Sequence, residues 1–205
     1  MLKTIKTIPL DGGRLCFDFI NTVHSWKTED RTDFFTNHDD FLVWCRRLSL
    51  TTPTKRALSK NRDRSDFNTA LEKIIRVRKV LYQLFSSIAE GATPGREVEA
   101  AFNGYLADAL KRIRIRVSAG KLSILIDEED DPLLAPLFHI LKSCYDVLTL
   151  DEIGRIKQCS NCGWIFYDST RNNRRRWCNP LTCGSMDKSK RYYWRTRAQS
   201  GDHSH

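Results

Sequence analysis

Residues 158–183 read QCSNCGWIFYDSTRNNRRRWCNPLTC and hold four of the seven cysteines of this 205-residue chain. The thiols form two pairs, Cys159-x2-Cys162 and Cys178-x4-Cys183. Structural Zn²⁺ takes four soft ligands at tetrahedral corners, and a Cys-x2-Cys turn brings two sulfurs close enough to share one ion. The spacing therefore predicts a Zn²⁺ site with these four cysteines as ligands; the alternative is that the thiols are free or redox-active.

The remaining sequence favours a metal over disulfides. An odd number of cysteines argues against a complete disulfide framework. The N-terminal MLKTIKTIPLDGG has no apolar stretch typical of a secretory signal, and no apolar run is long enough to span a bilayer. We therefore expect a cytoplasmic protein without a membrane partner, in which thiols stay reduced. Three single cysteines in apolar contexts are predicted to be buried structural thiols: Cys16, Cys45 and Cys144.

The positive charge of the chain is concentrated around the clustered cysteines. The formal net charge is +9, and residues 155–197 hold 11 Lys and Arg against two Asp. Residues 1–154, in contrast, hold 23 basic and 22 acidic residues. Four thiolates on one Zn²⁺ would add about two negative charges to the C-terminal segment. The segment would remain strongly positive, which predicts a polyanionic partner.

The order of residue types over 154–198 predicts a small metal-stabilised unit. Residues 164–167 are rich in strand formers, residues 168–173 are typical of a turn, and residues 175–177 return toward the second cysteine pair. We therefore expect a hairpin between the two pairs, followed by a basic helix with Ser185 as its N-cap. A Cys-x2-Cys knuckle, a hairpin, a second cysteine pair and a helix, in this order, are typical of a treble-clef-like finger. The metal would supply folding energy to such a unit.

The preceding residues, 1–153, are predicted to form a mainly α, multihelical domain with one β-hairpin. Apolar residues recur at helical spacing, whereas residues 112–127 alternate apolar and polar residues around Ala119-Gly120. Residues 199–205 are expected to be a disordered tail. The other predicted elements are a short strand leading into a helix at 14–25, helices at 38–49 and 133–150, a loop with a helical turn at 51–65, a helix capped by Asp66 and ended near Gly91, and a helix begun by Thr93-Pro94.

No catalytic arrangement is visible in the helical part. The sequence has no glycine-rich phosphate loop and no nucleophile elbow, and four cysteines would leave no open position on the metal. We therefore do not expect an enzyme. His139 lies in an apolar helix and is predicted to be a core residue. Asp18 and Asn21 are polar residues in the apolar stretch LCFDFINTV; they are expected to bond to nearby backbone, or alternatively to form one wall of a small-molecule pocket.

Two parts of the chain resemble known families. CSNCGWIFYDSTRNNRRRWC, followed by a basic helix, resembles the CGNR zinc finger, in which a C-x-x-C, an aromatic strand, an R-R-W-C segment and a C-G-N-R segment occur in this order. RLCFDFINTVHSW and the helical part resemble the ABATE domain that precedes this finger. The resemblance implies metal binding by the four cysteines and a stress-induced transcription regulator. Where the family reads C-G-N-R, this chain has Cys183-Gly184-Ser185-Met186, so Met186 cannot do what that arginine does.

The favoured function is binding of nucleic acid, with double-stranded DNA as the expected partner. The helical domain could then sense a small-molecule effector. Lys188, Arg191 and Arg195 share one face of the last predicted helix, and Lys190, Trp194 and Arg197 share another. The candidate nucleic-acid-binding residues are Arg171, Arg174, Arg175, Arg176, Lys188, Lys190, Arg191, Arg195 and Arg197.

Other interpretations of the basic segment remain open. The basic run could be a solvated face, or the finger could be a protein-interaction module that binds an acidic partner. Four aromatic residues could either pack the finger or stack on bases, and packing is favoured: Trp177, Tyr192, Tyr193 and Trp194. The sequence leaves the oligomeric state open.

Overall fold

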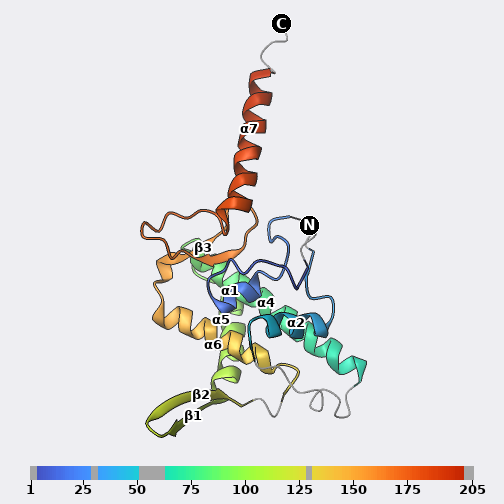
Figure 1. The fold of residues 1–205 in the computed structure, drawn as a ribbon, viewed down its shortest axis with the longest axis vertical. Coiled ribbons are helices and arrows are strands. Elements are labelled where there is room, and N and C mark those ends of the chain that lie inside the picture. Colours follow the sequence, from blue (N-terminus) through green and yellow to red (C-terminus); the bar gives the residue numbers. More distant parts are fainter. Residues whose placement is uncertain (1–3, 29–31, 51–62, 128–130, 201–205) are drawn as a thin grey trace.

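The computed structural model describes residues 4–28, 32–50, 63–127 and 131–200. Figure 1 shows a helical body from which a β-hairpin projects at one end and the C-terminal helix at the other. This confirms the mainly helical fold with a hairpin and a C-terminal cluster of four cysteines. Most of the loop predicted at 51–65, and the tail beyond residue 200, lie outside the described residues. Among the helices of the described ranges, none is long and apolar enough to cross a membrane.

In the described part of the chain up to residue 150, the body contains five helices and a hairpin. They are α1 (Leu15–Ile20), α2 (His38–Arg47), α4 (Arg64–Ala89), α5 (Arg96–Leu110), β1 (Ile113–Ser118), β2 (Lys121–Ile126) and α6 (Ala135–Leu150). The C-terminal part contains a 3-10 turn (Ile153–Arg155), β3 (Ile156–Gln158), β4 (Ile165–Tyr167), a π-helical turn (Pro180–Gly184) and α7 (Ser185–Ser200).

The long helix α4 organises the body. Its buried face includes Ile74, Val77, Leu81 and Phe85, and it packs against α1, α2, α5 and both strands of the finger. The helix begins three residues earlier than predicted, because Asp63 is its N-cap. The predicted cap, Asp66, is instead the reciprocal member of a capping box: each of the two carboxylates accepts a hydrogen bond from the other residue's backbone N–H.

The prediction of a strand before a helix at 14–25 is wrong. The segment forms helix α1 first, and the β interaction follows it as an isolated antiparallel bridge between Val23 and Asp33. Cys16, Phe17, Phe19 and Ile20 are all fully buried. A short helix buried around most of its circumference has no polar face, and so its sequence lacks the 3.6-residue period.

The start of α5 also differs from the prediction. Gly95 is the N-cap, and the helix begins at Arg96 rather than next to Thr93. Gly95 has an extended backbone, with φ −62° and ψ 145°, as N-cap residues usually do. The predicted helices at 38–49 and 133–150 are confirmed as α2 and α6, and Pro136 lies in the first turn of α6. His139 is partly buried there, and Cys16, Cys45 and Cys144 are buried.

The predicted hairpin at 112–127 is confirmed. β1 and β2 pair without interruption from Ser118↔Lys121 to Ile113↔Ile126. Ala119 and Gly120 form the two-residue turn, and both have positive φ (48° and 74°), as a type I′ turn requires. At the base of the hairpin, the guanidinium of Arg112 lies 4.4 Å from the ring centroid of Phe138 in α6.

The finger's own hairpin has a different partner from the one predicted. β4 pairs with β3, which precedes the first cysteine pair, and not with residues 175–177. The Cys-x2-Cys turn is therefore itself the connection between two antiparallel strands. Because the hydrogen bonds of β4 go to β3, residues 168–177 form a loop instead of a strand.

Body and finger share one hydrophobic core. Trp164, Ile165 and Phe166 of the finger are almost fully buried and belong to the same cluster as Phe17 and Phe85. The division of the chain near residue 153 into two folding units stays a prediction. The packing across that division nevertheless means that neither part covers its apolar residues alone.

Candidate metal centre and nucleic-acid interface

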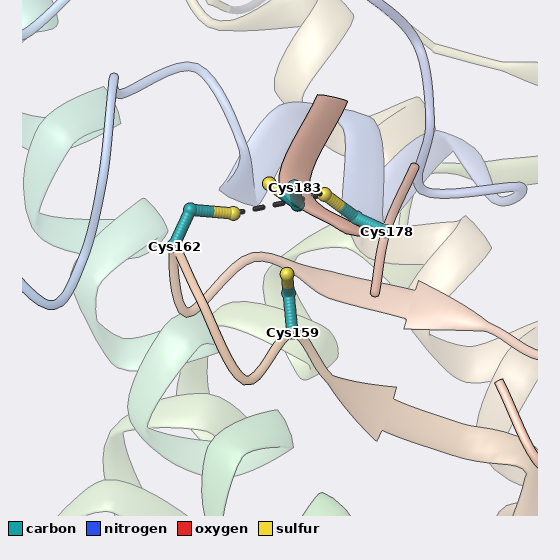
Figure 2. Close-up of side chains that lie close together, drawn as sticks. All are labelled: Cys159, Cys162, Cys178 and Cys183. Carbon is teal, nitrogen blue, oxygen red and sulfur yellow. Dashed lines mark hydrogen bonds between the residues drawn. The ribbon is translucent and has the colours of Figure 1, made fainter. Parts of the chain in front are cut away.

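The four clustered cysteines meet at one point (Figure 2). The Sγ atoms of Cys159, Cys162, Cys178 and Cys183 all lie within 4.8 Å of one another, and all four residues are buried. Two of the sulfur–sulfur distances, Cys162–Cys178 and Cys178–Cys183, are 3.6 Å. A tetrahedral ion with bonds of about 2.3 Å separates its sulfurs by about 3.8 Å. The four thiols can therefore hold one metal ion.

Local geometry places the first pair. Cys159 directly follows β3, and its N–H donates to the Trp164 carbonyl at 2.7 Å, while Gly163 N–H donates to the Cys159 carbonyl at 3.0 Å. Gly163 has φ +77°, which favours glycine, and a Cβ there would lie 3.0 Å from the Cβ of Trp26. The knuckle is thus closed tightly against the body.

The second pair is placed by the segment that leads into α7. Cys183 lies in the π-helical turn that continues directly into that helix, so Ser185 is inside a helical segment and the prediction that it is the N-cap is wrong. Asn179 is the cap, since its Oδ1 accepts from Leu181 N–H at 2.9 Å and Pro180 occupies the first helical position. An Asn-Pro pair before a helix is a signal that the sequence does contain.

The chemistry of the thiols suits a cation. Hydrogen bonds from the Cys162, Cys178 and Cys183 thiols hold the pKa of Cys159 far below its usual value. The pKa of Cys178 is raised, mainly by its hydrogen bond to Cys159 and further by those to Cys162 and Cys183. The thiolate of Cys159 is thus stabilised by hydrogen bonds from its neighbours. Metal binding would displace the remaining protons, because thiolates are the ligating form.

The helical body supports the knuckle through backbone hydrogen bonds. The Asn21 side chain bonds both backbone groups of Ile165: its Oδ1 accepts from N–H at 3.0 Å and its Nδ2 donates to the carbonyl at 2.8 Å. Trp26 N–H donates to the Cys162 carbonyl at 2.8 Å, and the Trp164 indole donates to the Val23 carbonyl at 2.9 Å. The body therefore contributes to the shape of the metal centre.

The side chains of Asp18 and Asn21 both form hydrogen bonds with backbone groups. Asp18 Oδ1 accepts from Gly12 N–H at 2.8 Å, and burial raises the pKa of this carboxyl to about 6. Asn21 is fully engaged with Ile165, which is far from it in sequence. The interpretation that these residues bond to backbone agrees with these contacts. The alternative, that these two residues form one wall of a small-molecule pocket, stays a prediction.

A cavity of about 170 Å³ lies beside the metal centre, where body and finger meet at the start of α7. Asp11, His24, Met186 and Lys190 are among the residues that line it. Met186, which stands where the family has arginine, is half exposed. Its side chain faces this cavity, and so an arginine at this position would lie in a cavity that Asp11 also lines.

The loop that carries Arg171, Arg174, Arg175 and Arg176 is held by a buried carboxylate. Asp168 Oδ1 accepts from the Thr170 N–H and hydroxyl, and Oδ2 accepts from Arg175 N–H. Burial would raise the pKa of Asp168, but these hydrogen bonds outweigh burial and lower it. The pattern Asp168-x-Thr170 is typical of a turn in which the carboxylate bonds the backbone two residues on.

The four arginines of this loop have different surroundings. Arg175 is fastened inside the finger: its guanidinium lies 4.7 Å from the Phe166 ring centroid and donates to the carbonyls of Trp177 and Cys178. Arg171, Arg174 and Arg176 are exposed. Of the loop arginines predicted to contact nucleic acid, Arg175 therefore has a structural role that occupies its side chain.

Helix α7 projects away from the body (Figure 1), and every residue from Lys188 to Arg197 is exposed. The predicted packing of the aromatic residues therefore holds for Trp177, which contacts the core, but not for the α7 residues. The exposed fractions are Tyr192 70%, Tyr193 52% and Trp194 65%. A prediction of packing assumes a neighbouring element, and α7 has none beside these residues among the described ranges.

The basic residues of α7 fall on two faces, as predicted from their spacing. Lys188, Arg191 and Arg195 line one shallow groove together with Tyr192. Arg191 also pairs with Asp187 at 3.1 Å. On the other side Lys190 Nζ donates to Asn161 Oδ1 at 3.3 Å, and Arg197 donates to the Tyr193 hydroxyl at 2.7 Å. Lys190 thus bonds to a residue outside α7, whereas the ion pair of Arg191 on the groove-lining face stays within the helix.

Comparisons with known families cover both parts of the structure. A family model of the CGNR zinc finger matches residues 155–196, which include all four clustered cysteines. A model of the ABATE family, described as "Putative stress-induced transcription regulator", matches residues 13–150. No curated protein matches the chain.

Proposed function

The chain belongs to the ABATE family and ends in a CGNR zinc finger, and from this premise we propose that it is a transcription regulator whose α7 binds double-stranded DNA. One observation carries the proposal. An exposed helix with a row of cations begins directly at the four-cysteine centre and projects clear of the body. A helix presented in this way can enter a groove without a clash from the rest of the molecule.

We also propose that the metal is Zn²⁺. Four thiolates form a closed tetrahedral set, which is the ligand set of structural zinc sites. Such an ion would fix the start of α7 relative to the Cys-x2-Cys knuckle. Cys183 directly precedes the helix, and Cys162 belongs to the knuckle. With all four positions taken by sulfur, the ion has a structural task, and the proposal includes no catalytic step. The cytoplasm is the compartment that we propose for this protein.

Duplex DNA is favoured by the dimensions and charges of α7. The major groove of B-DNA is about 12 Å wide and admits one α-helix, whose diameter with side chains is about 10–12 Å. On the groove-lining face, Lys188 and Arg195 can reach phosphates or base edges, while Tyr192 lies between them. The exposed loop residues Arg171, Arg174 and Arg176 can add phosphate contacts beside the helix.

The test is the salt dependence of binding. Each phosphate contact that is neutralised contributes about −0.9 to the slope of log K against log salt on duplex DNA. Replacing Lys188, Arg191 and Arg195 together with Ala should weaken binding and reduce the magnitude of the slope by roughly 2 to 3 units. Fluorescence anisotropy with a labelled duplex and metal-loaded protein measures both quantities.

A matched control separates the site from net charge. Lys73, Arg76 and Lys79 lie on α4 of the body, and their replacement with Ala removes the same charge without touching α7. This variant should keep the wild-type slope. If metal-loaded protein binds no duplex even at low salt, the DNA proposal fails, and a protein-interaction module with an acidic partner takes its place.

A further inference from the structure

The β1–β2 hairpin lies at the end of the molecule opposite α7 (Figure 1), and one of its faces is apolar and exposed. Cross-strand partners lie on the same face, so that Ile115 stands beside Ile124 and Val117 beside Leu122. These four side chains are 68%, 51%, 70% and 65% exposed, respectively. A two-stranded hairpin alone is marginally stable in water. An exposed apolar face on a two-stranded hairpin is therefore suited to a further partner.

The backbone of β2 offers an open edge for such a partner. In a hairpin with a two-residue turn, Ser118 and Lys121 form a hydrogen-bonded pair, and the bonded pairs recur at every second residue. Asp127 N–H donates to the Arg112 carbonyl at 2.9 Å, in agreement with this pattern. The N–H and C=O groups of Leu122, Ile124 and Ile126 consequently point away from β1. No strand of the described residues lies against that edge.

We propose that two copies of the chain associate through these edges, β2 pairing antiparallel with β2 of the second copy. A two-fold axis at Ile124 places this residue opposite its own copy and Leu122 opposite Ile126. All three of these residues carry the outward-pointing backbone groups that the pairing needs. The product is a four-stranded sheet in which the apolar side chains of the two β2 strands lie side by side.

Charge complementarity selects this edge and this register. The same two-fold pairing brings Lys121 of one copy opposite Asp127 of the other, at both ends of the paired segment. Asp127 lies 3.4 Å from Arg114 in its own chain and is about one-third exposed, so a second cation can approach it. Pairing of β1 strands about Ile115 would instead place Arg114 opposite Arg116, and like charges directly opposite each other are destabilising.

The size of the contact sets its strength. An edge of six residues is only about 20 Å long, so each copy buries a small area. Stable complexes bury about 800 Å² per partner. The dimer should therefore be weak and reversible, and its population should depend on protein concentration.

Sedimentation analysis of metal-loaded, full-length protein over a range of concentrations, without DNA, tests the proposal. The wild type should shift from monomer to dimer as concentration rises. Ile124→Pro removes an N–H that points away from β1, so it should abolish the shift while leaving the bonds within the hairpin. Lys121→Asp should weaken the dimer about tenfold, because two attractive pairs become repulsive, and the further change Asp127→Lys should restore it.

A cross-linking experiment checks the register without a risk to folding. Residues opposite each other in a hydrogen-bonded pair have Cα atoms about 5.5 Å apart, a separation that suits a disulfide. Ile124→Cys should give a disulfide-linked dimer under mild oxidation, whereas Val117→Cys, on the same face but away from the edge, should not. A protein that stays monomeric at all concentrations, or a dimer unaffected by both Ile124→Pro and Lys121→Asp, overturns the proposal. Binding of lipid vesicles by a monomeric chain overturns it as well.

Discussion

Asn21 shows how one side chain can join two distant parts of the chain. Its amide closes two hydrogen bonds with the backbone of Ile165, between the finger and the first helix of the body. The residue is 1% exposed, so water cannot replace these bonds. A buried backbone group without a partner costs about 1–3 kcal/mol.

Replacement of Asn21 should therefore destabilise the whole protein. Asn21→Ala leaves one N–H and one carbonyl of Ile165 unpaired, and we expect the free energy of unfolding to fall by about 2–4 kcal/mol. Urea unfolding of the metal-loaded protein measures this change. Asn103→Ala, at an exposed position of α5, is the matched control and should stay within about 0.5 kcal/mol of the wild type. Equal stability of the two variants would contradict the structural role of Asn21.

Asp18 makes stability depend on pH. Burial raises the pKa of its carboxyl in the folded protein to about 6, whereas the unfolded value is about 3.9. The folded state therefore binds the proton more tightly. The resulting stabilisation is complete below about pH 4 and is lost as pH rises through about 6.

Asp18→Asn should remove this dependence, because an amide oxygen can still accept from Gly12 N–H but does not titrate. Between pH 5 and 7.5 the wild type should lose about 1 kcal/mol relative to the variant. Urea unfolding of both proteins over this range gives the difference directly. If the free energies of unfolding of the two proteins changed equally with pH, the pKa of the Asp18 carboxyl would not be raised in the folded state.

At the scale of elements, the β3–β4 hairpin and the start of α7 depend on the four thiols. Each cysteine pair lies at the end of one of these elements, so a central ion would join them. The body also contacts the knuckle directly, since both Trp26 N–H and the Ser25 hydroxyl donate to the Cys162 carbonyl. Disturbance of the metal centre should thus reach the tryptophans of the body.

Cys162→Ser should lose the metal and rearrange this region. Elemental analysis should give about one zinc per chain for the wild type and almost none for the variant. The near-UV circular dichroism of the variant should change, because Trp26 and Trp164 both pack at the knuckle. Cys45→Ser replaces a buried thiol of α2 and should keep the metal. Carefully reduced wild-type protein without metal would refute the site.

At the scale of the whole molecule, the shared core argues against independent folding of the body. A fragment of residues 1–153 would expose the surfaces that Trp164, Ile165 and Phe166 cover, and would leave the Val23 carbonyl and Trp26 N–H without their partners. Residues 1–154 have nearly balanced charge, with 23 basic and 22 acidic residues, but charge balance does not cover apolar surface.

We expect the 1–153 fragment to aggregate, or to melt well below the full-length protein. Thermal melting followed by far-UV circular dichroism, together with light scattering, distinguishes these outcomes. Residues 1–200 serve as the control, because this fragment keeps the finger and removes only the end of the chain. Cooperative melting of the shorter fragment at the full-length temperature would show that the body is self-sufficient.

The sequence by itself determined the features that depend on neighbouring residues. The spacing of the cysteines indicated their cluster, the apolar period of residues 71–88 indicated α4, and Ala119-Gly120 indicated the β1–β2 turn, because knuckles, helix faces and tight turns are formed by residues close in the chain.

Tertiary structure alone decided the strand partner of β4, the bond between Asn21 and Ile165, the internal role of Arg175 and the exposure of Trp194. Each of these depends on which element lies alongside. A strand, an amide or an aromatic ring can be satisfied by many partners, and only the packing of distant segments selects one of them.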